Sequence, residues 1–264
     1  MSFQDKVVWV TGASSGIGKA LVFELSQQNA LLIISARNEK ALEEVKLQCK
    51  IPDRVKVLPL DLEDYKVFDQ KVTQAISWFG RIDILVNNGG ISQRSFAKDT
   101  SIDVDKRIMK TNYIGTISLT KTVLPHFIER QQGHFVVTTS IVGKIGTPLR
   151  STYAASKHAL HGFFDSLRAE LYNDNIDVTL VCPGYVTTNI SINALLGDGT
   201  KQQTMDKATA NGIKPTRFAK LMAKAISKKR QEVYIAGAKE KLGVYVKRWV
   251  PKLYSFMVRK LSVT

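Results

Sequence analysis

The sequence has little cysteine and no long apolar run. Its two cysteines, Cys49 and Cys182, are too few for a disulfide framework and show no metal-binding spacing. The four histidines also lack metal-ligand spacing with cysteine or acidic residues. No apolar stretch approaches the roughly 20 residues that a membrane-spanning helix needs. We therefore expect neither a disulfide-stapled domain, nor a metal site, nor a spanning segment.

The first residues lack the features of a secretory signal. The chain enters an apolar run at Val7, which leaves no room for a positively charged start, an apolar signal core and a cleavage site. We therefore expect a cytoplasmic protein. The chain has no internal repeat, low-complexity tract or interdomain linker, and its 44% hydrophobic content suffices for a sizeable core. The expected organisation is a single domain over residues 1–264.

Acidic residues are scarce near the C-terminus. Residues 214–264 carry 14 Lys and Arg against two acids, whereas the other 213 residues carry 24 basic and 21 acidic side chains. Such a concentration of positive charge suits a nucleic acid, an anionic membrane or an acidic ligand. No recognised nucleic-acid-binding motif accompanies this charge, so we expect no specific nucleic-acid partner.

The segment 239–264 within this basic region is amphipathic. Residues at helical spacing in this segment form one stripe, which consists of Leu242, Val246, Trp249, Leu253, Met257 and Lys260. A stripe of this kind flanked by Lys and Arg is typical of a helix that lies in a membrane interface, so peripheral membrane contact is one expectation. The alternative is that the stripe packs on the protein's own core or on a sister subunit while the charges are solvated. Pro251 predicts a division into two short helices.

Short apolar runs alternate with longer amphipathic segments along the first 180 residues. Continuous apolar runs rich in β-branched residues are typical of strands covered on both faces, as in a parallel sheet. The expected strands are 7–10, 31–35, 55–60, 82–86, 135–139 and 178–182. The expected helices between them are 17–28, 39–49, 64–79, 102–130 and 152–173. This alternation predicts an α/β fold of the Rossmann type, a doubly wound parallel sheet with helices on both faces.

The alternation stops after the sixth expected strand. Residues 185–212 show no amphipathic period, and so long a loop in a compact enzyme is usually a lid or disordered. We expect a substrate lid there. A helix over 215–229 and a short strand over 232–235 follow.

A glycine-rich turn follows the first expected strand. Glycines at 12, 16 and 18 open directly into a helix. Without side chains the backbone can approach a diphosphate closely, and the free amides at the helix start favour its negative charge. A purely structural turn is the alternative, but the position between a first strand and a first helix predicts dinucleotide binding. The residues expected to bind the cofactor here are Gly12, Ser14, Ser15, Gly16, Ile17 and Gly18.

No acidic residue ends the second expected strand. An acid at that position would hydrogen-bond the adenosine ribose and repel an added phosphate. The sequence there is Ser-Ala-Arg-Asn, and Arg37 with Ser14 can hold a 2′-phosphate by charge-assisted hydrogen bonds. We therefore predict NADP(H) as the cofactor, the alternative being that Arg37 is an exposed residue at a helix start. Asp61 is a candidate partner for the adenine amino group, although it could equally cap a helix.

Tyr153 and Lys157 are four residues apart in an expected helix and so share one face. A free phenol has a pKa of about 10 and is a poor proton carrier near neutrality. A cation at about 4 Å, at an effective dielectric of ~20, supplies on the order of 4 kcal/mol, comparable with roughly three pKa units. Lysine can thus make the tyrosine a working acid or base, but this spacing alone also occurs often by chance.

Taken together, these motifs resemble the short-chain dehydrogenase/reductase family from residue 6 to about residue 237. The glycine turn resembles the family's cofactor motif, the segment Asn-Asn-Gly-Gly at 87–90 its Asn-Asn-Ala-Gly segment, and Tyr-Ala-Ala-Ser-Lys at 153–157 its catalytic motif. Gly89 departs from the usual alanine, which adds backbone freedom but removes no polar group. Within the family, residues 142–146 and 156–164 are most similar to dehydrogenase/reductase members 7 and 7B.

The resemblance implies a role for each matched residue. Tyr153 would donate the proton in reduction, and Lys157 would lower the pKa of that tyrosine and hydrogen-bond the nicotinamide ribose. Ser140 would orient the carbonyl oxygen, and Asn112 would hold a water that links Lys157 to solvent. The further cofactor contacts implied are Leu62, Asn88, Pro183, Gly184, Val186 and Thr188. The family likeness also implies a homodimer or a homotetramer.

The function expected from the sequence is hydride transfer between NADP(H) and a carbonyl or secondary alcohol. Candidates to face the substrate are Gln93, Ile141, Leu149, Tyr185 and residues 190–212. Their largely uncharged character favours an apolar ketone, steroid, retinoid or lipid-like substrate. The alternative is a dinucleotide-sensing binding protein that acts through its basic C-terminal region and needs no intact catalytic set.

Overall fold

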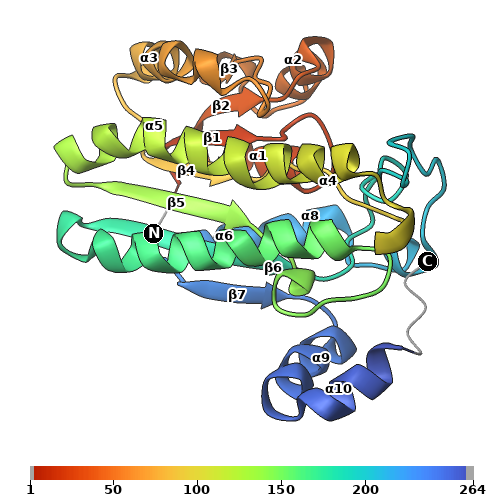
Figure 1. The fold of residues 1–264 in the computed structure, drawn as a ribbon. Helices are drawn as coiled ribbons and strands as arrows, with labels where there is room; N and C mark the ends of the chain where they lie inside the picture. The colour runs from red at the N-terminus through yellow and green to blue at the C-terminus, as the bar shows by residue number, and fades with distance from the viewer. Residues whose placement is uncertain (1–2, 260–264) are drawn as a thin grey trace.

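The computed structural model describes residues 3–259, and its centre is one seven-stranded sheet (Figure 1). The strand order is β3-β2-β1-β4-β5-β6-β7, and every neighbouring pair is parallel. The strands are β1 Val7–Thr11, β2 Leu31–Ser35, β3 Val55–Val57, β4 Ile84–Asn87, β5 Gly133–Thr138, β6 Ile176–Pro183 and β7 Glu232–Ile235. This topology confirms the predicted doubly wound, Rossmann-type fold.

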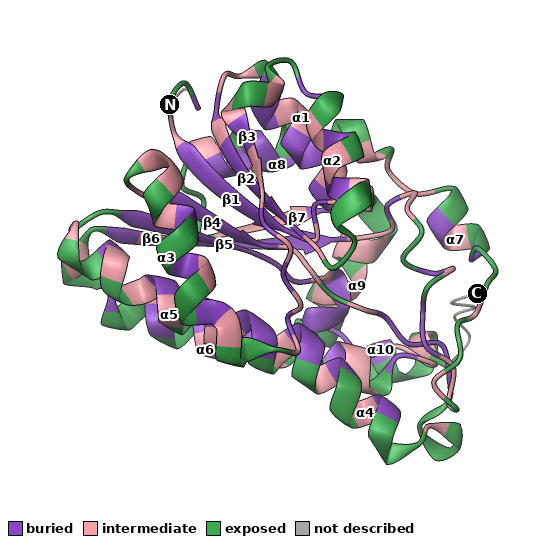
Figure 2. Ribbon diagram, turned by 90° about the horizontal axis from the view of Figure 1, so that it is seen from above, coloured by how far each residue is buried: buried purple, intermediate pink, exposed green. Residues whose placement is uncertain are grey.

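Helices cover both faces of the sheet, which explains why the strands are apolar on both sides (Figure 2). One face carries α1 Gly16–Gln27, α2 Glu39–Leu47 and α8 Pro215–Ser227. The opposite face carries α3 Phe68–Phe79, α5 Gly115–Glu129 and α6 Ser151–Glu170. Every residue of β1 is buried, and the indole nitrogen of Trp9 donates to Ser35 Oγ at 2.8 Å, so its one polar group is satisfied.

The helix expected over 102–130 is continuous but irregular. It consists of α4 Ile102–Met109, a π-helical turn over Lys110–Ile114, and α5. The wider turn brings Asn112 inward, where its side chain pairs with the backbone of Ile91. The strand expected over 55–60 ends earlier, at Val57, although the backbone nitrogens of Leu58 and Leu60 still donate to Ile34 and Ala36.

The strand order changes direction between β1 and β4. From β1 the sheet extends outward to β3 on one side, and from β4 it extends to β7 on the other. In sheets of this kind, ligands bind in the crevice beyond the carboxyl ends of the strands at this switch point. The glycine turn follows β1, and the Asn88 segment follows β4, so both expected motifs lie at this crevice.

The segment expected as a lid, 185–212, is irregular except for the short helix α7 Lys207–Ala210. Isolated bridges hold it in place: Gln93 pairs with Leu195, and Val186 pairs with Ile213. Its backbone is therefore tied both to the loop after β4 and to the start of α8.

Two short helices end the described chain, α9 Ala238–Trp249 and α10 Pro251–Val258. Pro251 is the first residue of α10, which confirms the predicted division of the basic segment. Of the sequence-predicted stripe, Lys260 lies outside the described residues. Among the helices described, none combines the length and the apolar character required to cross a bilayer.

Candidate functional site

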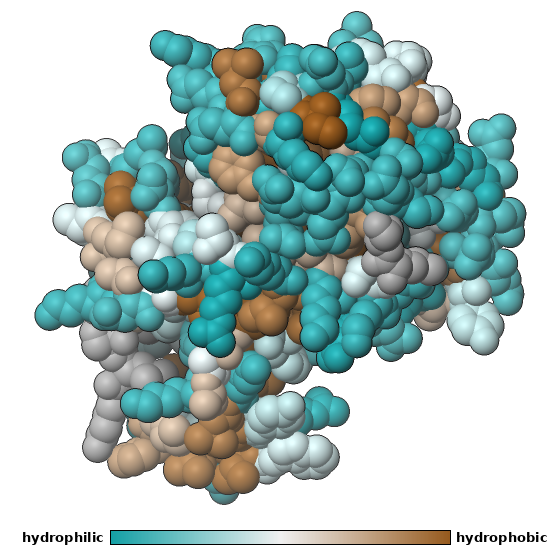
Figure 3. All heavy atoms as spheres, turned by 180° about the vertical axis from the view of Figure 1, so that it is seen from behind, coloured by the Kyte–Doolittle hydropathy of each residue, from teal (hydrophilic) through white to brown (hydrophobic). Residues whose placement is uncertain are grey.

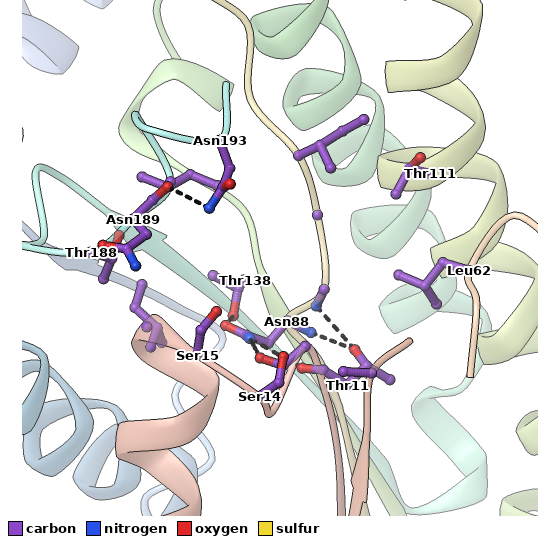
Figure 4. A pocket seen from close by; sticks show the side chains of 18 of the residues that line it. Thr11, Ser14, Ser15, Leu62, Asn88, Thr111, Thr138, Thr188, Asn189 and Asn193 are labelled. Atoms are coloured by element: carbon purple, nitrogen blue, oxygen red, sulfur yellow. Dashed lines mark hydrogen bonds between the residues drawn. The ribbon is translucent and has the colours of Figure 1, made fainter. Parts of the chain in front are cut away.

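A cavity of about 440 Å³ opens at the carboxyl edge of the sheet. It is lined by residues that follow β1, β2, β4, β5 and β6. Figure 4 shows Thr188, Asn189 and Asn193 on one side of the cavity and Leu62 and Thr111 on the other. Of the residues predicted from sequence to bind cofactor or to take part in catalysis, only Gly18 and Asn112 do not line it. Those that do are Gly12, Ser14, Ser15, Gly16, Ile17, Arg37, Asp61, Leu62, Asn88, Ser140, Tyr153, Lys157, Pro183, Gly184, Val186 and Thr188.

The glycine turn forms a cradle that side chains would fill. Gly12 has φ +64°, and a Cβ there would lie 2.8 Å from the Cα of Gly89. A Cβ on Gly18 would collide with the carbonyl oxygen of Gly12, so this glycine lets α1 start directly against the turn. No side chain caps the N-terminus of α1 and its first turn holds no acid, so its free amides suit a diphosphate.

Asn88 joins the two loops that meet at the switch point (Figure 4). Its amide nitrogen donates to the carbonyl oxygen of Thr11 at 3.1 Å, and its amide oxygen accepts from Thr138 Oγ1 at 3.2 Å. The hydroxyl of Thr11 accepts from the backbone nitrogens of Asn88 and Gly89. These bonds fix the ends of β1, β4 and β5 relative to one another. Asn88 therefore both lines the cavity and stabilises the strand ends around it.

The end of β2 carries a cation and no acid at the cavity wall. Arg37 is exposed and lines the cavity together with Ser14. Asp61 also lines it, and its Oδ1 accepts from the backbone nitrogen of Glu63 at 3.0 Å. Asp61 thus stabilises a turn rather than capping a helix, and it still faces the cavity.

The side chains of Tyr153 and Ser140 meet at a hydrogen bond inside the cavity. Tyr153 lies in the first turn of α6, and Ser140 follows β5 by two residues, where its Oγ also accepts from Val142 N at 3.2 Å. Burial raises the pKa of the Tyr153 phenol, whereas Arg150, the bond to Ser140 and Arg94 act to lower it. Burial is the largest of these influences, so the pKa of Tyr153 is raised and the phenol stays protonated, while the two arginines and Ser140 oppose part of that rise.

Lys157 lies one helical turn beyond Tyr153, with its Nζ 5.8 Å from the centroid of the tyrosine ring. The ammonium donates to the carbonyl oxygen of Thr138 at 2.8 Å. Burial lowers the pKa of Lys157 to about 8, which makes its charge state sensitive to pH near neutrality. The nearby cations that lower the pKa of Tyr153 are the two arginines, which the sequence interpretation had not identified.

Asn112 is wholly buried behind the cavity rather than in its wall. Its side chain exchanges two hydrogen bonds with the backbone of Ile91 and donates to Ser156 Oγ at 3.1 Å. A Cβ atom added to Gly90 would lie 3.0 Å from Asn112 Oδ1 and 3.6 Å from Lys157 Nζ. Asn112 and Lys157 thus both approach Gly90, and the water predicted between Asn112 and Lys157 stays a prediction.

An ion-pair network that sequence reasoning missed connects the segment 185–212 to the catalytic helix. Asp206 bonds Arg94 at 2.5 Å and lies 3.6 Å from Arg150, and all three side chains are at most 7% exposed. Arg150 immediately precedes α6, and its guanidinium lies 5.3 Å from the ring centroid of Tyr185. No local sequence pattern marks these residues, because the chain separates Arg94 from Asp206 by 112 positions.

Four residues expected to face the substrate do not line this cavity. Gln93 is fully buried, and its Oε1 accepts from the backbone nitrogens of Thr152 and Tyr153, so it braces the start of α6. Ile141 packs into a small apolar core, the Tyr185 ring lies against Arg150, and Leu149 is outside the cavity wall. The residues of 190–212 that do line it are Ile190, Asn193, Leu195 and Lys201.

Comparison with known proteins places this geometry in a family. A family model described as short chain dehydrogenase matches residues 6–197. Dehydrogenase/reductase SDR family member 7 of Homo sapiens is 44% identical over 264 residues, covering 98% of this chain and 78% of the relative. Dehydrogenase/reductase SDR family member 7B of Bos taurus is 42% identical over 258 residues, covering 95% and 79%.

A solved structure agrees on the fold. The short-chain dehydrogenase/reductase from Burkholderia phymatum, determined in complex with NAD, superposes with a TM-score of 0.83 at 21% identity, covering 96% of each chain. The similarity to members 7 and 7B expected from the sequence is confirmed by the curated relatives. The chain belongs to the short-chain dehydrogenase/reductase family of oxidoreductases.

Proposed function

We propose that the protein transfers a hydride between NADP(H) and a carbonyl or secondary alcohol, with Tyr153 as the proton donor in the direction of reduction. The observation that carries this proposal is the hydrogen-bonded pair of Tyr153 and Ser140 in the cavity wall, with Lys157 one helical turn away. The glycine cradle, the Asn88 support and this pair all open on one cavity.

The shape of the cradle supports a dinucleotide there. Gly12 and Gly16 line the cavity at the start of α1, where they leave the backbone open to a diphosphate, and Thr188 lies beside Gly16. The bound nicotinamide supplies or accepts the hydride, and the chain supplies position and the proton. Arg37 with Ser14, at a β2 end without an acid, favours the 2′-phosphate of NADP(H) over the free ribose of NAD.

Proton transfer is the step that this chain's residues perform. In reduction, the phenol of Tyr153 gives its proton to the oxygen that becomes the alcohol, while the Ser140 hydroxyl orients that oxygen. The phenolate left behind is stabilised by Arg150 and Arg94, which lower the pKa of Tyr153, and by the bond to Ser140. Lys157, which donates to the carbonyl oxygen of Thr138, and the nearby Asn112 would return a proton from solvent to Tyr153.

The substrate that we propose is an uncharged, largely apolar carbonyl compound. Ile91, Ile190 and Leu195 line the cavity, and Asn189 and Asn193 add neutral polar groups. Segment 185–212 supplies most of these side chains and would act as the substrate lid. A steroid, retinoid or lipid-like ketone fits this mixture better than a phosphorylated sugar.

The test is NADPH oxidation by the pure protein against a panel of aldehydes, steroids, retinoids and quinones. A substrate should emerge, and Tyr153→Phe should lower turnover by at least about 100-fold while NADPH binding stays nearly unchanged. Full activity in a folded Tyr153→Phe protein would contradict the mechanism. NADPH binding without turnover of any carbonyl would instead favour the dinucleotide-sensing alternative.

A further inference from the structure

The two C-terminal helices present a group of large apolar side chains to solvent. We call this group the C-terminal apolar surface; its members are Leu242, Tyr245, Trp249, Val250, Leu253, Phe256 and Met257. Trp249 is 77% exposed and Phe256 is 57% exposed. Figure 3 shows the brown atoms of this surface at the lower edge of the molecule, over α9 and α10. A contiguous apolar patch of this kind indicates an interaction site.

The opposite side of the same helices is already packed on the protein. Tyr254 is buried, and its hydroxyl donates to the carbonyl oxygen of Gly146 at 2.6 Å. Val244, Val246 and Val258 pack with Tyr254 against Ile141 and Ile145. The helices are therefore anchored without the C-terminal apolar surface, and Trp249 and Leu253 are not part of the apolar cluster that anchors them.

The two helices that present this surface are rich in cations, and their one acid is bonded to the protein's own backbone. The basic residues of α9, α10 and the residue that follows are Lys239, Lys241, Lys247, Arg248, Lys252 and Arg259. Glu240 is the one acid over the same stretch, and its carboxylate is engaged by the backbone nitrogens of Tyr185 and Gly237. Exposed apolar and aromatic side chains on a stretch that carries six Lys and Arg and one inward-facing acid match the composition of a helix lying in an anionic lipid interface.

Either a second copy of this chain or a lipid bilayer could cover such a surface, and the charge of the protein favours the bilayer. A second copy of this chain would bring the same cations face to face, on a protein whose formal net charge is already +15. A bilayer with anionic phospholipids offers opposite charge to the lysines and arginines and a hydrocarbon boundary to Trp249 and Phe256. We propose that α9 and α10 dock the protein peripherally on a membrane that contains anionic phospholipid.

Docking in this way would bring the membrane close to the cavity. α9 packs against the turn over residues 141–143, directly after Ser140, and Glu240 holds the backbone of Tyr185 beside the cavity wall. If the proposed function holds, an apolar carbonyl substrate would reach the cavity from the lipid. The docking proposal rests on the exposed residues and their charge rather than on the proposed function. Its test does not use enzymatic activity.

The experiment is sedimentation of the full chain with vesicles of phosphatidylcholine containing 30% phosphatidylserine, compared with phosphatidylcholine alone. We expect binding to the anionic vesicles that weakens at higher salt. Trp249→Ser with Phe256→Ser, and separately Lys247→Glu with Arg248→Glu, should each lower the partition coefficient at least about tenfold. The matched control combines Tyr172→Ser with Lys121→Glu, exposed positions far from α9 and α10 along the chain, and should bind like the native protein.

Fluorescence of Trp249 gives a second readout in the folded, intact chain. The other two tryptophans are Trp9, which is fully buried, and Trp78, which is half-buried. Anionic vesicles should therefore shift the emission to the blue through Trp249, and Trp249→Phe should remove most of that shift. Failure of the native protein to bind anionic vesicles would overturn the proposal. So would a dimer, seen by analytical ultracentrifugation, that Trp249→Ser dissociates while neither protein binds lipid.

Discussion

Arg94 and Asp206 form a buried ion pair at 2.5 Å between the loop that follows β4 and the segment 185–212. Their side chains are 4% and 1% exposed. Arg150 approaches the same carboxylate to 3.6 Å, so one acid serves two buried cations. The fold of 185–212 is therefore tied electrostatically to the helix that carries Tyr153 and Lys157.

Replacing Asp206 by Asn should destabilise the protein by about 3 kcal/mol, because two buried guanidinium groups lose their shared counter-charge. Urea unfolding measures the loss, and limited proteolysis should find new cleavage within 185–212. The control is Asp198→Asn, an exposed acid of the same segment that makes only local bonds to Thr200, and it should unfold like the native protein. Equal stability of the two variants would show that the ion pair does not hold this segment.

Replacing Arg150 by Met should raise the pKa of Tyr153, because a cation that favours the phenolate is lost. Alcohol oxidation needs Tyr153 as the phenolate, so the acidic limb of its pH profile should move to higher pH. Arg168→Met changes an arginine near the other end of α6, bonded to Asp165 at 2.7 Å, and should leave the limb in place. An unshifted limb in a folded Arg150 variant would remove this arginine from proton transfer.

The affinity for NADPH should fall as pH rises through about 8. The pKa of buried Lys157 lies near 8, below its ordinary value of 10.5, so the amine is charged at pH 7 and mostly neutral at pH 9.5. Fluorescence titration at these two pH values measures the change. Lys157→Ala should bind weakly and equally at both, whereas Tyr153→Phe should keep the native pH dependence. The same dependence in Lys157→Ala would assign it to another group.

Replacing Ala36 by Asp together with Arg37 by Leu should invert the cofactor preference from NADP(H) to NAD(H). The new carboxylate can hydrogen-bond the ribose and repels the 2′-phosphate, and the charge partner of that phosphate is lost. The ratio of kcat/KM for the two cofactors checks this on one substrate. Native protein that uses both cofactors equally would contradict the assigned role of Arg37.

The sequence predicts best where one short segment contains the whole physical cause. The apolar runs, the glycine turn before α1 and Pro251 at the start of α10 each act within a few residues, and the structure has these elements where they were expected. Helical spacing likewise places Tyr153 and Lys157 on one face, and the surrounding motif singles out this pair.

A residue's role cannot be predicted from the sequence where it depends on a contact with a residue far away in the chain. Nothing near Arg94 indicates that Asp206 will neutralise it, and Gln93, which was expected to face the substrate, instead holds the start of α6 through its Oε1. The π-helical turn at Asn112 is likewise selected by its two bonds to Ile91, which is 21 positions away in the chain. The same is true of Ile141, whose burial depends on the two C-terminal helices.

Glu240 uses its two carboxylate oxygens for two different parts of the protein. One accepts from Gly237 N at the start of α9, and the other accepts from Tyr185 N at 2.6 Å beside the cavity. Thermodynamic linkage between two binding sites is reciprocal. If a molecule bound at α9 moves this carboxylate and thereby changes the affinity of the cavity for its ligand, then that ligand changes the affinity of α9 for the molecule by the same factor. Cutting the chain after Gly237 would remove Glu240, and with it a support of the Tyr185 loop, as well as the two helices. Point substitutions on the solvent-exposed face of α9 and α10 leave both hydrogen bonds of Glu240 in place.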